Sequence, residues 1–175
     1  MMKIIILSGK AQVGKDTFAK KIQEHFGKRK AFIAAYADML KIILKRNFKY
    51  TGIKDEEERR VMQRCGDMFR RADKTFFVDI VRRILYAVLQ LNYDYFIITD
   101  ARFDNEVSCI KDDSYLAPHT KAFRLVRDSD NSLGETRNHA SEQGVSDDLI
   151  DAEIHLENNI DYDITKYLDI IIGED

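Results

Sequence analysis

This chain has little of what marks secreted, membrane-bound or nucleic-acid-binding proteins. Its 175 residues include two cysteines, one proline and no tryptophan, and the net charge is -2. Cys65 and Cys109 lack the spacing of a metal site or a disulfide framework, which favours free thiols in a reducing compartment. So small a charge provides no long-range field to recruit a nucleic-acid polymer or an acidic membrane. Basic residues must therefore act locally, in a site.

Long apolar runs and linker-like stretches are also absent. The opening Met-Met-Lys-Ile-Ile-Ile-Leu is too short for a signal peptide or a membrane span, and it passes directly into a glycine-containing loop. Hydrophobic residues make up 45% and charged residues 33%, the balance of a globular protein. With no Gly/Ser-rich segment and no visible repeat, we expect a single domain over residues 1–175, located in the cytoplasm.

The most informative segment, Gly9–Thr17, reads Gly-Lys-Ala-Gln-Val-Gly-Lys-Asp-Thr and follows the apolar run Ile4–Leu7. Its G-x-x-x-x-G-K spacing is that of a phosphate-binding loop (P-loop). The glycines let backbone N–H groups surround phosphate oxygens, and Lys15 brings a positive charge to the terminal phosphates. We expect Lys15 to be a partly exposed ligand rather than a core residue. The residues predicted to bind the nucleotide phosphates are Gly9, Ala11, Val13, Gly14, Lys15, Asp16 and Thr17.

Asp16 departs from the Ser or Thr that usually follows the P-loop lysine. A carboxylate beside a triphosphate is repelled unless a cation lies between them, so Asp16 favours a role on Mg²⁺ through its water shell. Thr17 is then free to bond an inner phosphate. The alternative is that Asp16 stabilises the positive first turn of the following helix, and the two roles are compatible.

Strands that alternate with helices predict an α/β fold with three layers, in which helices cover both faces of a mostly parallel sheet. Strands are expected near 3–7, 31–36, 95–99 and 122–126. Helices are expected near 15–26, 39–46, 76–91, 103–111 and 163–168, with a charged helix opening at 54–60 and an ambiguous end at 170–172, either strand or helix. The charged run favours a solvated face, whereas helical spacing predicts a core stripe of Phe77, Ile80, Val81, Ile84, Leu85 and Val88.

Several polar side chains follow the ends of the predicted strands, where ligands bind in such sheets. Asp100 ends a buried strand, as a magnesium-holding carboxylate would, and Arg102 can form a bidentate fork to a phosphate. Alternatively, these two pair with each other or cap the next helix. Asp38 faces the same crevice, with an N-cap role as its alternative. Arg127 precedes a polar loop near 128–139, which we expect to close over the site as a lid.

Five segments of the chain occur in a suggestive order. They are Gly14–Thr17 (GKDT), Ala37–Lys41 (ADMLK), Met62–Arg70 (MQ with Gly66 and the final Arg), Asp100–Glu106 (DARFDNE) and His139–Glu142 (HASE). Together they resemble the deoxynucleoside monophosphate kinase family, best known from bacteriophages, with its GKDT loop and its ADPLK, LQ…G…R, DVRFPNE and H-x-SE segments. Met39 and Asp104 replace the family's prolines, which changes loop stiffness more than chemistry.

The resemblance implies a P-loop nucleoside-monophosphate-kinase fold, ATP as donor, Mg²⁺ as cofactor and a nucleoside monophosphate, above all a deoxynucleotide, as acceptor. It implies in-line transfer of the ATP γ-phosphoryl group, in which positioning and charge neutralisation carry the catalysis. Carried over residue by residue, it implies catalytic roles for Lys15, Arg102 and Arg127, and magnesium at Asp16 and Asp100. Acceptor binding would fall to Asp38, Lys41, Arg70, Asp100, Arg102, Glu106 and His139.

Three other functions share parts of this pattern. A phosphomevalonate kinase also tolerates Asp after the P-loop lysine, and a non-catalytic nucleotide-binding protein would keep the loop alone. A guanine-reading switch is disfavoured because the chain has no Asn-Lys-x-Asp motif. The expected partners are thus ATP and a nucleoside monophosphate, without nucleic acid or membrane, while a homodimer, the accepted base and the sugar preference stay open.

Overall fold

The structure, a computed structural model, describes residues 2–48, 50–52, 56–127, 144–159 and 161–173. Its centre is a five-stranded sheet with strand order β2-β3-β1-β4-β5. All four pairings in this sheet are parallel, which confirms the predicted α/β architecture with a mostly parallel sheet. The strands are β1 (Lys3–Ser8), β2 (Ala31–Ala34), β3 (Tyr95–Ala101), β4 (Thr120–Val126) and β5 (Ala152–His155).

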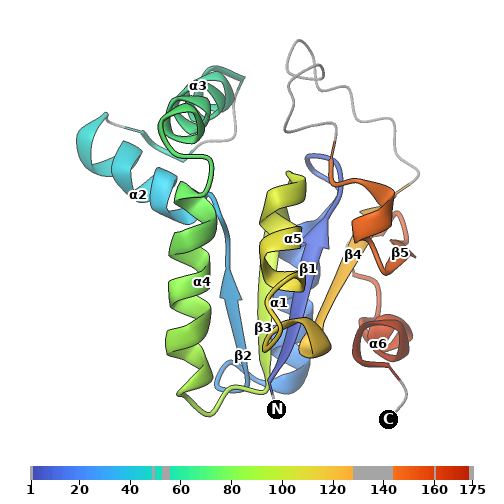
Figure 1. The fold of residues 1–175 in the computed structure, drawn as a ribbon. Coiled ribbons are helices and arrows are strands. Elements are labelled where there is room, and N and C mark those ends of the chain that lie inside the picture. The colour runs from blue at the N-terminus through green and yellow to red at the C-terminus, as the bar shows by residue number, and fades with distance from the viewer. Residues whose placement is uncertain (1, 49, 53–55, 128–143, 160, 174–175) are drawn as a thin grey trace.

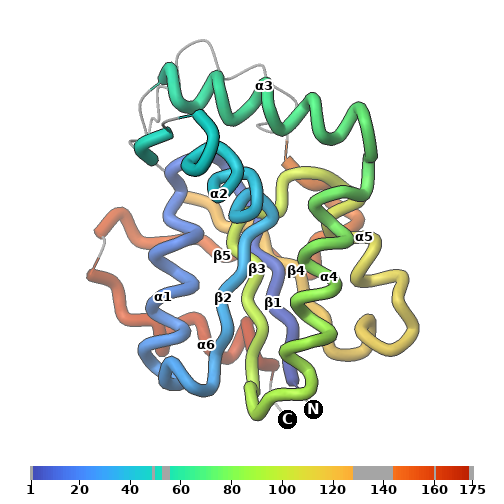
Figure 2. Tube along the Cα trace, turned by 90° about the vertical axis from the view of Figure 1, so that its left-hand side faces the viewer, coloured from blue at the N-terminus to red at the C-terminus, as the bar shows by residue number. Residues whose placement is uncertain are grey.

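Helices cover both faces of the sheet (Figures 1 and 2). They are α1 (Lys15–Phe26), α2 (Asp38–Asn47), α3 (Glu56–Ala72), α4 (Phe76–Leu89), α5 (Asp104–Lys111) and α6 (Thr165–Ile172), with short 3-10 turns at Ala117–His119 and Asp147–Leu149. In Figure 2, α1 lies on one side of the strands and α4 with α5 on the other, while α3 runs across the carboxyl ends of the strands. None of the helices described is long and apolar enough to cross a membrane.

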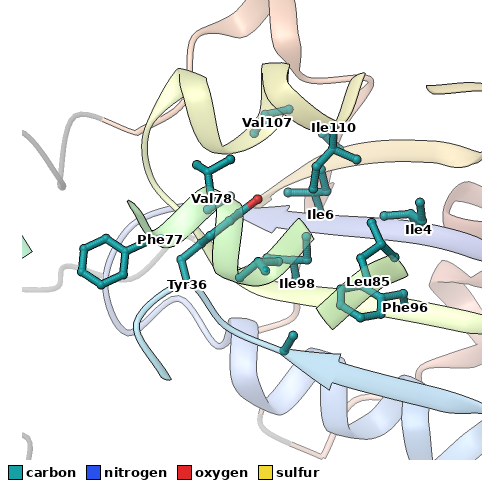
Figure 3. Close-up of a cluster of buried hydrophobic side chains, with 14 of the residues drawn as sticks. Ile4, Ile6, Tyr36, Phe77, Val78, Leu85, Phe96, Ile98, Val107 and Ile110 are labelled. Carbon is teal, nitrogen blue, oxygen red and sulfur yellow. The ribbon is translucent and has the colours of Figure 1, made fainter. Parts of the chain in front are cut away.

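The core has two halves because the central strand is buried on both faces. Ile4 and Ile6 of β1 pack into the half closed by α2, α4 and α5, part of which is drawn in Figure 3. Ile5 and Leu7 point the opposite way and pack against α1 and α6. Each such side chain contributes roughly 1.5–3 kcal/mol on burial. Two-sided burial explains why this strand reads as an unbroken apolar run instead of alternating with polar residues.

Two details differ from the sequence-based expectations, and a third decides between two alternatives that the sequence left open. The short edge strand β5 was not predicted, since only Ile154 among its four residues is buried. The ambiguous residues 170–172 are the helical end of α6. Ile84 was expected in the core stripe of α4 but is 36% exposed, because it lies at the margin of the buried face. The predicted lid near 128–139 and His139 lie outside the described residues.

Candidate functional site

The P-loop joins β1 to α1, so strand, loop and helix occur in the order that phosphate binding requires. Gly9 and Gly14 have φ angles of 133° and 109°, in the region that favours glycine. A Cβ on Gly9 would lie 2.5 Å from the backbone oxygen of Leu125 in β4. Gly9 is therefore required both by the turn and by the close approach of the neighbouring strand.

Lys15, the first residue of α1, is more deeply placed than expected. The residue is only 7% exposed, and its ammonium group donates hydrogen bonds to the backbone oxygens of Gly9 at 2.6 Å and Lys10 at 2.9 Å. The expectation of a partly exposed side chain was thus wrong, because the curl of the loop brings its own carbonyl groups around the lysine. This arrangement holds the positive charge at the mouth of the loop.

A cavity of about 490 Å³ opens beside the P-loop, at the carboxyl ends of the strands. The P-loop, α2, α3 and the segment after β3 all contribute to its wall. Ten of the predicted site residues line it: Ala11, Gly14, Lys15, Asp16, Thr17, Lys41, Arg70, Asp100, Arg102 and Glu106. The structure therefore brings the donor loop and most of the predicted acceptor residues to one cavity.

Four of the predicted residues are described but lie off this wall. Gly9 packs against β4, and the Val13 side chain belongs to the core between the sheet and α1. Arg127 lies beside the P-loop: its Nη2 is 3.5 Å from the position of a Cβ on Gly14. The Arg127 Nε is buried and has no hydrogen-bond partner within the described chain.

Asp38 lies off the cavity wall as well, but acts on a residue that lines it. Its Oδ1 accepts a hydrogen bond from the Lys41 ammonium at 3.0 Å, and its Oδ2 accepts one from the Ala35 N–H at 3.1 Å. The alternative prediction, that Asp38 is the N-cap of this helix, is wrong. Asp38 is the first residue of α2, and Ala37 precedes it as the cap. Nearby acidic groups, Asp38 first among them, raise the pKa of Lys41 against the opposing effect of burial, so Lys41 stays charged.

Asp100 is fixed by the segment that follows β2. Its two oxygens accept hydrogen bonds from the N–H groups of Tyr36 at 2.7 Å and Ala37 at 3.0 Å. Burial raises the pKa of Asp100, while those two hydrogen bonds and the charges of Lys41 and Arg102 act in the opposite direction. The carboxylate thus ties the ends of two adjacent strands together and still borders the cavity.

The donor set for magnesium can be tested on these residues. The described chain contains no group of three or more His, Cys, Asp or Glu side chains that could hold a metal by themselves. Asp16 and Asp100 do line the same cavity. Mg²⁺ in such sites is commonly held by one or two carboxylates together with substrate phosphates and water. Asp16 and Asp100 are of the chemical type that such a site uses.

Glu106 is the most deeply buried acidic residue of the cavity wall, at 2% exposure. Its Oε2 accepts hydrogen bonds from the N–H groups of Arg102 at 2.8 Å and Phe103 at 3.2 Å. Burial and the nearby charge of Asp100 raise the pKa of Glu106 to about 7, against the opposing effects of those hydrogen bonds and of Arg70. The Glu106 side chain thus bonds the backbone at the start of α5.

Helix α3 contributes to the cavity wall along more of its length than the prediction for Arg70 implied. The charged run 54–60 at its start was expected to be a solvated face, yet Arg59 borders the cavity. A stripe at helical spacing carries this face: Arg59, Met62, Gln63, Gly66 and Arg70. That spacing was the available signal, but the high charge of the segment concealed it. Tyr36, Leu40 and Tyr50 add apolar surface to the same wall.

Comparison with known proteins places the fold but not the substrate. No protein-family model matches the sequence, and no curated protein is similar to it in sequence. Among solved structures, the chain is similar to an APS kinase of Mycobacterium tuberculosis, with a TM-score of 0.50 and 10% identity over 98% of each chain. It also matches a sugar kinase from a Janibacter species, with a TM-score of 0.47 and 13% identity over 96% of this chain and 93% of the other. The first likeness shows that the chain shares the fold of that APS kinase.

Proposed function

We propose that this chain is a nucleoside monophosphate kinase, which transfers the γ-phosphoryl group of ATP to the phosphate of a nucleoside monophosphate, in particular a deoxynucleotide. The observation that carries the proposal is a second set of cations facing the P-loop. Lys41 of α2, Arg70 of α3 and Arg102 in the turn after β3 line the same cavity as Lys15. A simple nucleotide binder needs only the loop, whereas a phosphoryl transferase with an anionic acceptor needs both sets.

The remaining wall suits a nucleoside. Leu40, Tyr50 and Met62 provide apolar surface, and Gln63 provides an amide that can both donate and accept hydrogen bonds. A cavity of about 490 Å³ is within the range for a ligand of this size. These features support a flat, hydrogen-bonding base attached to an anionic group.

The chemistry demands little proton transfer. The acceptor oxygen of a monophosphate is already anionic, so catalysis rests on alignment of the two phosphates and on neutralisation of their charge. Lys15 would contact the phosphoryl group during its transfer, and Arg102 would hold the acceptor phosphate. Asp16 and Asp100 would hold Mg²⁺, which when bound neutralises negative charge on the donor phosphates.

A substrate panel tests the proposal. The purified chain is incubated with ATP, Mg²⁺ and each ribo- and deoxyribonucleoside monophosphate in turn, and ADP formation is measured. Turnover of one or more monophosphates, above ATP hydrolysis without acceptor, is the expected result. Phosphorylated alcohols such as phosphomevalonate serve as the comparison set. Turnover confined to that set would favour a different small-molecule kinase, and none with either set would contradict the kinase assignment.

A further inference from the structure

The guanidinium group of Arg70 packs against two aromatic rings. The Cζ of its guanidinium group is 4.2 Å from the ring centre of Phe103 and 5.1 Å from that of Phe77. Arg70 belongs to α3, Phe77 to α4, and Phe103 to the turn between β3 and α5. An arginine over an aromatic face is attracted electrostatically to the ring, more strongly when water is excluded. Two helices and a turn therefore meet at this guanidinium.

Glu106 fixes the turn that carries Phe103. One oxygen of its buried carboxylate accepts the hydrogen bonds of the Arg102 and Phe103 N–H groups, and the other lies 3.6 Å from Nη2 of Arg70. The Glu106 side chain is only 3% exposed, so this bracing is shielded from water. The Phe103 ring is thus presented to Arg70 from a rigid turn.

Gly66 makes room for the same guanidinium. A Cβ at this position in α3 would lie 2.9 Å from Nη1 of Arg70, closer than real Cβ atoms approach their neighbours. Its absence lets the Arg70 side chain fold back along its own helix. The side chain remains 29% exposed and borders the cavity. Arg70 is therefore both restrained and accessible.

We propose that Phe103 is a positioning residue that holds Arg70 in place as a preformed receptor for the anionic group of the second substrate. Ordering a free arginine during binding costs side-chain entropy. In this chain the ring and the packing around it have ordered the side chain before the anion arrives, which strengthens binding. The identity of that anion as a monophosphate rests on the proposed function.

Kinetics with matched variants test the positioning. Phe103→Leu keeps the apolar bulk but removes the ring face, and it should raise the Michaelis constant for the monophosphate roughly tenfold while the constant for ATP stays unchanged. Phe103→Tyr restores the ring and should return the constant close to the wild-type value. Phe76→Leu is the control, because this ring packs against Phe77 in the same aromatic cluster. It should leave both constants close to wild type.

Nuclear magnetic resonance tests the geometry without any assumption about activity. Side-chain protons of Arg70, identified by their disappearance in Arg70→Lys, should be shifted upfield by the ring in the wild type and in Phe103→Tyr. Phe103→Leu should lose most of that shift. Titration with inorganic phosphate should move these signals in the wild type at lower concentrations than in Phe103→Leu.

The outcomes separate this inference from the proposed function. Arg70 signals with no ring shift in the wild type would overturn the positioning role. Equal monophosphate constants or equal phosphate titrations in wild type and Phe103→Leu would also overturn it. If no monophosphate is phosphorylated but the ring shift and the phosphate response follow Phe103, the proposed function fails and the positioning role stands.

Discussion

Replacing Glu106 by Gln should change how the stability of the protein depends on pH. The pKa of Glu106 is raised from 4.5 to about 7 in the folded chain, chiefly because burial disfavours its charged form. Between these two values the folded state binds more protons than the unfolded state, so wild-type stability falls as pH rises. A shift of the Glu106 pKa from 4.5 to about 7 corresponds to about 3 kcal/mol in the free energy of unfolding. Most of this contribution is lost between pH 5 and 7. Glu106→Gln is neutral throughout and should escape this loss.

Urea unfolding of both proteins at several pH values from 5 to 8 provides the measurement. The free energy of unfolding of Glu106→Gln, relative to that of the wild type, should increase with pH by about 3 kcal/mol over the whole interval. This difference should level off above pH 7. Glu24→Gln, at an exposed position of α1, is the control and should follow the wild type. Parallel curves for Glu106→Gln and wild type would refute the reasoning, because they would mean that folding leaves the pKa of Glu106 unchanged. The reasoning would also be refuted if the free energy of unfolding of the wild type increased with pH relative to that of Glu106→Gln.

Four further substitutions probe the P-loop and the acceptor side. Lys15→Ala should lower phosphoryl transfer roughly 10²-fold or more while circular dichroism shows an intact fold, and near-normal turnover would contradict the kinase assignment. Asp16→Ser should shift the Mg²⁺ dependence of the rate more than the affinity for ATP; an unchanged magnesium titration would favour the helix-terminus role. Arg102→Lys should raise the Michaelis constant of the monophosphate and lower turnover, with ATP binding measured alongside, because lysine keeps the charge but loses the fork. Gly9→Ala should lower the thermal midpoint as well as activity, since its Cβ would meet the Leu125 carbonyl at 2.5 Å, and a midpoint equal to wild type would show that the loop relaxes freely.

Much of the fold could be predicted because local signals and the global arrangement agree. The apolar run at β1, the P-loop and the helical pattern of α1 each have a physical reason that acts within a few residues. The bounds of α1 were predicted without error. β5 escaped prediction because a strand of four residues with a single buried side chain leaves almost no pattern, and its position depends on pairing with β4.

The candidate site was predictable in its residues but not in their contacts. Asp100 and Arg102 were expected beside the nucleotide because parallel strands end at one edge. That Asp100 would bond the backbone after β2, or that Phe103 would face Arg70, depends on elements distant in the sequence. Arg70 of α3 was expected on the acceptor side, but the charged start of this helix gives a strong solvent signal, which hid that Arg59 also borders the cavity.

The strand order has a consequence for how this protein is made. β1 is synthesised first, yet its two neighbours in the sheet are β3 and β4, so that Lys3 pairs with Tyr95 and Ile4 with Thr120. At roughly 5–20 residues per second, a ribosome needs on the order of ten seconds to deliver both partners. During that interval the Ile-Ile-Ile-Leu run of the central strand has no sheet to enter. Early in synthesis this chain therefore presents a segment that chaperones can bind and that neighbouring nascent chains can capture, and completion of β4 ends that exposure.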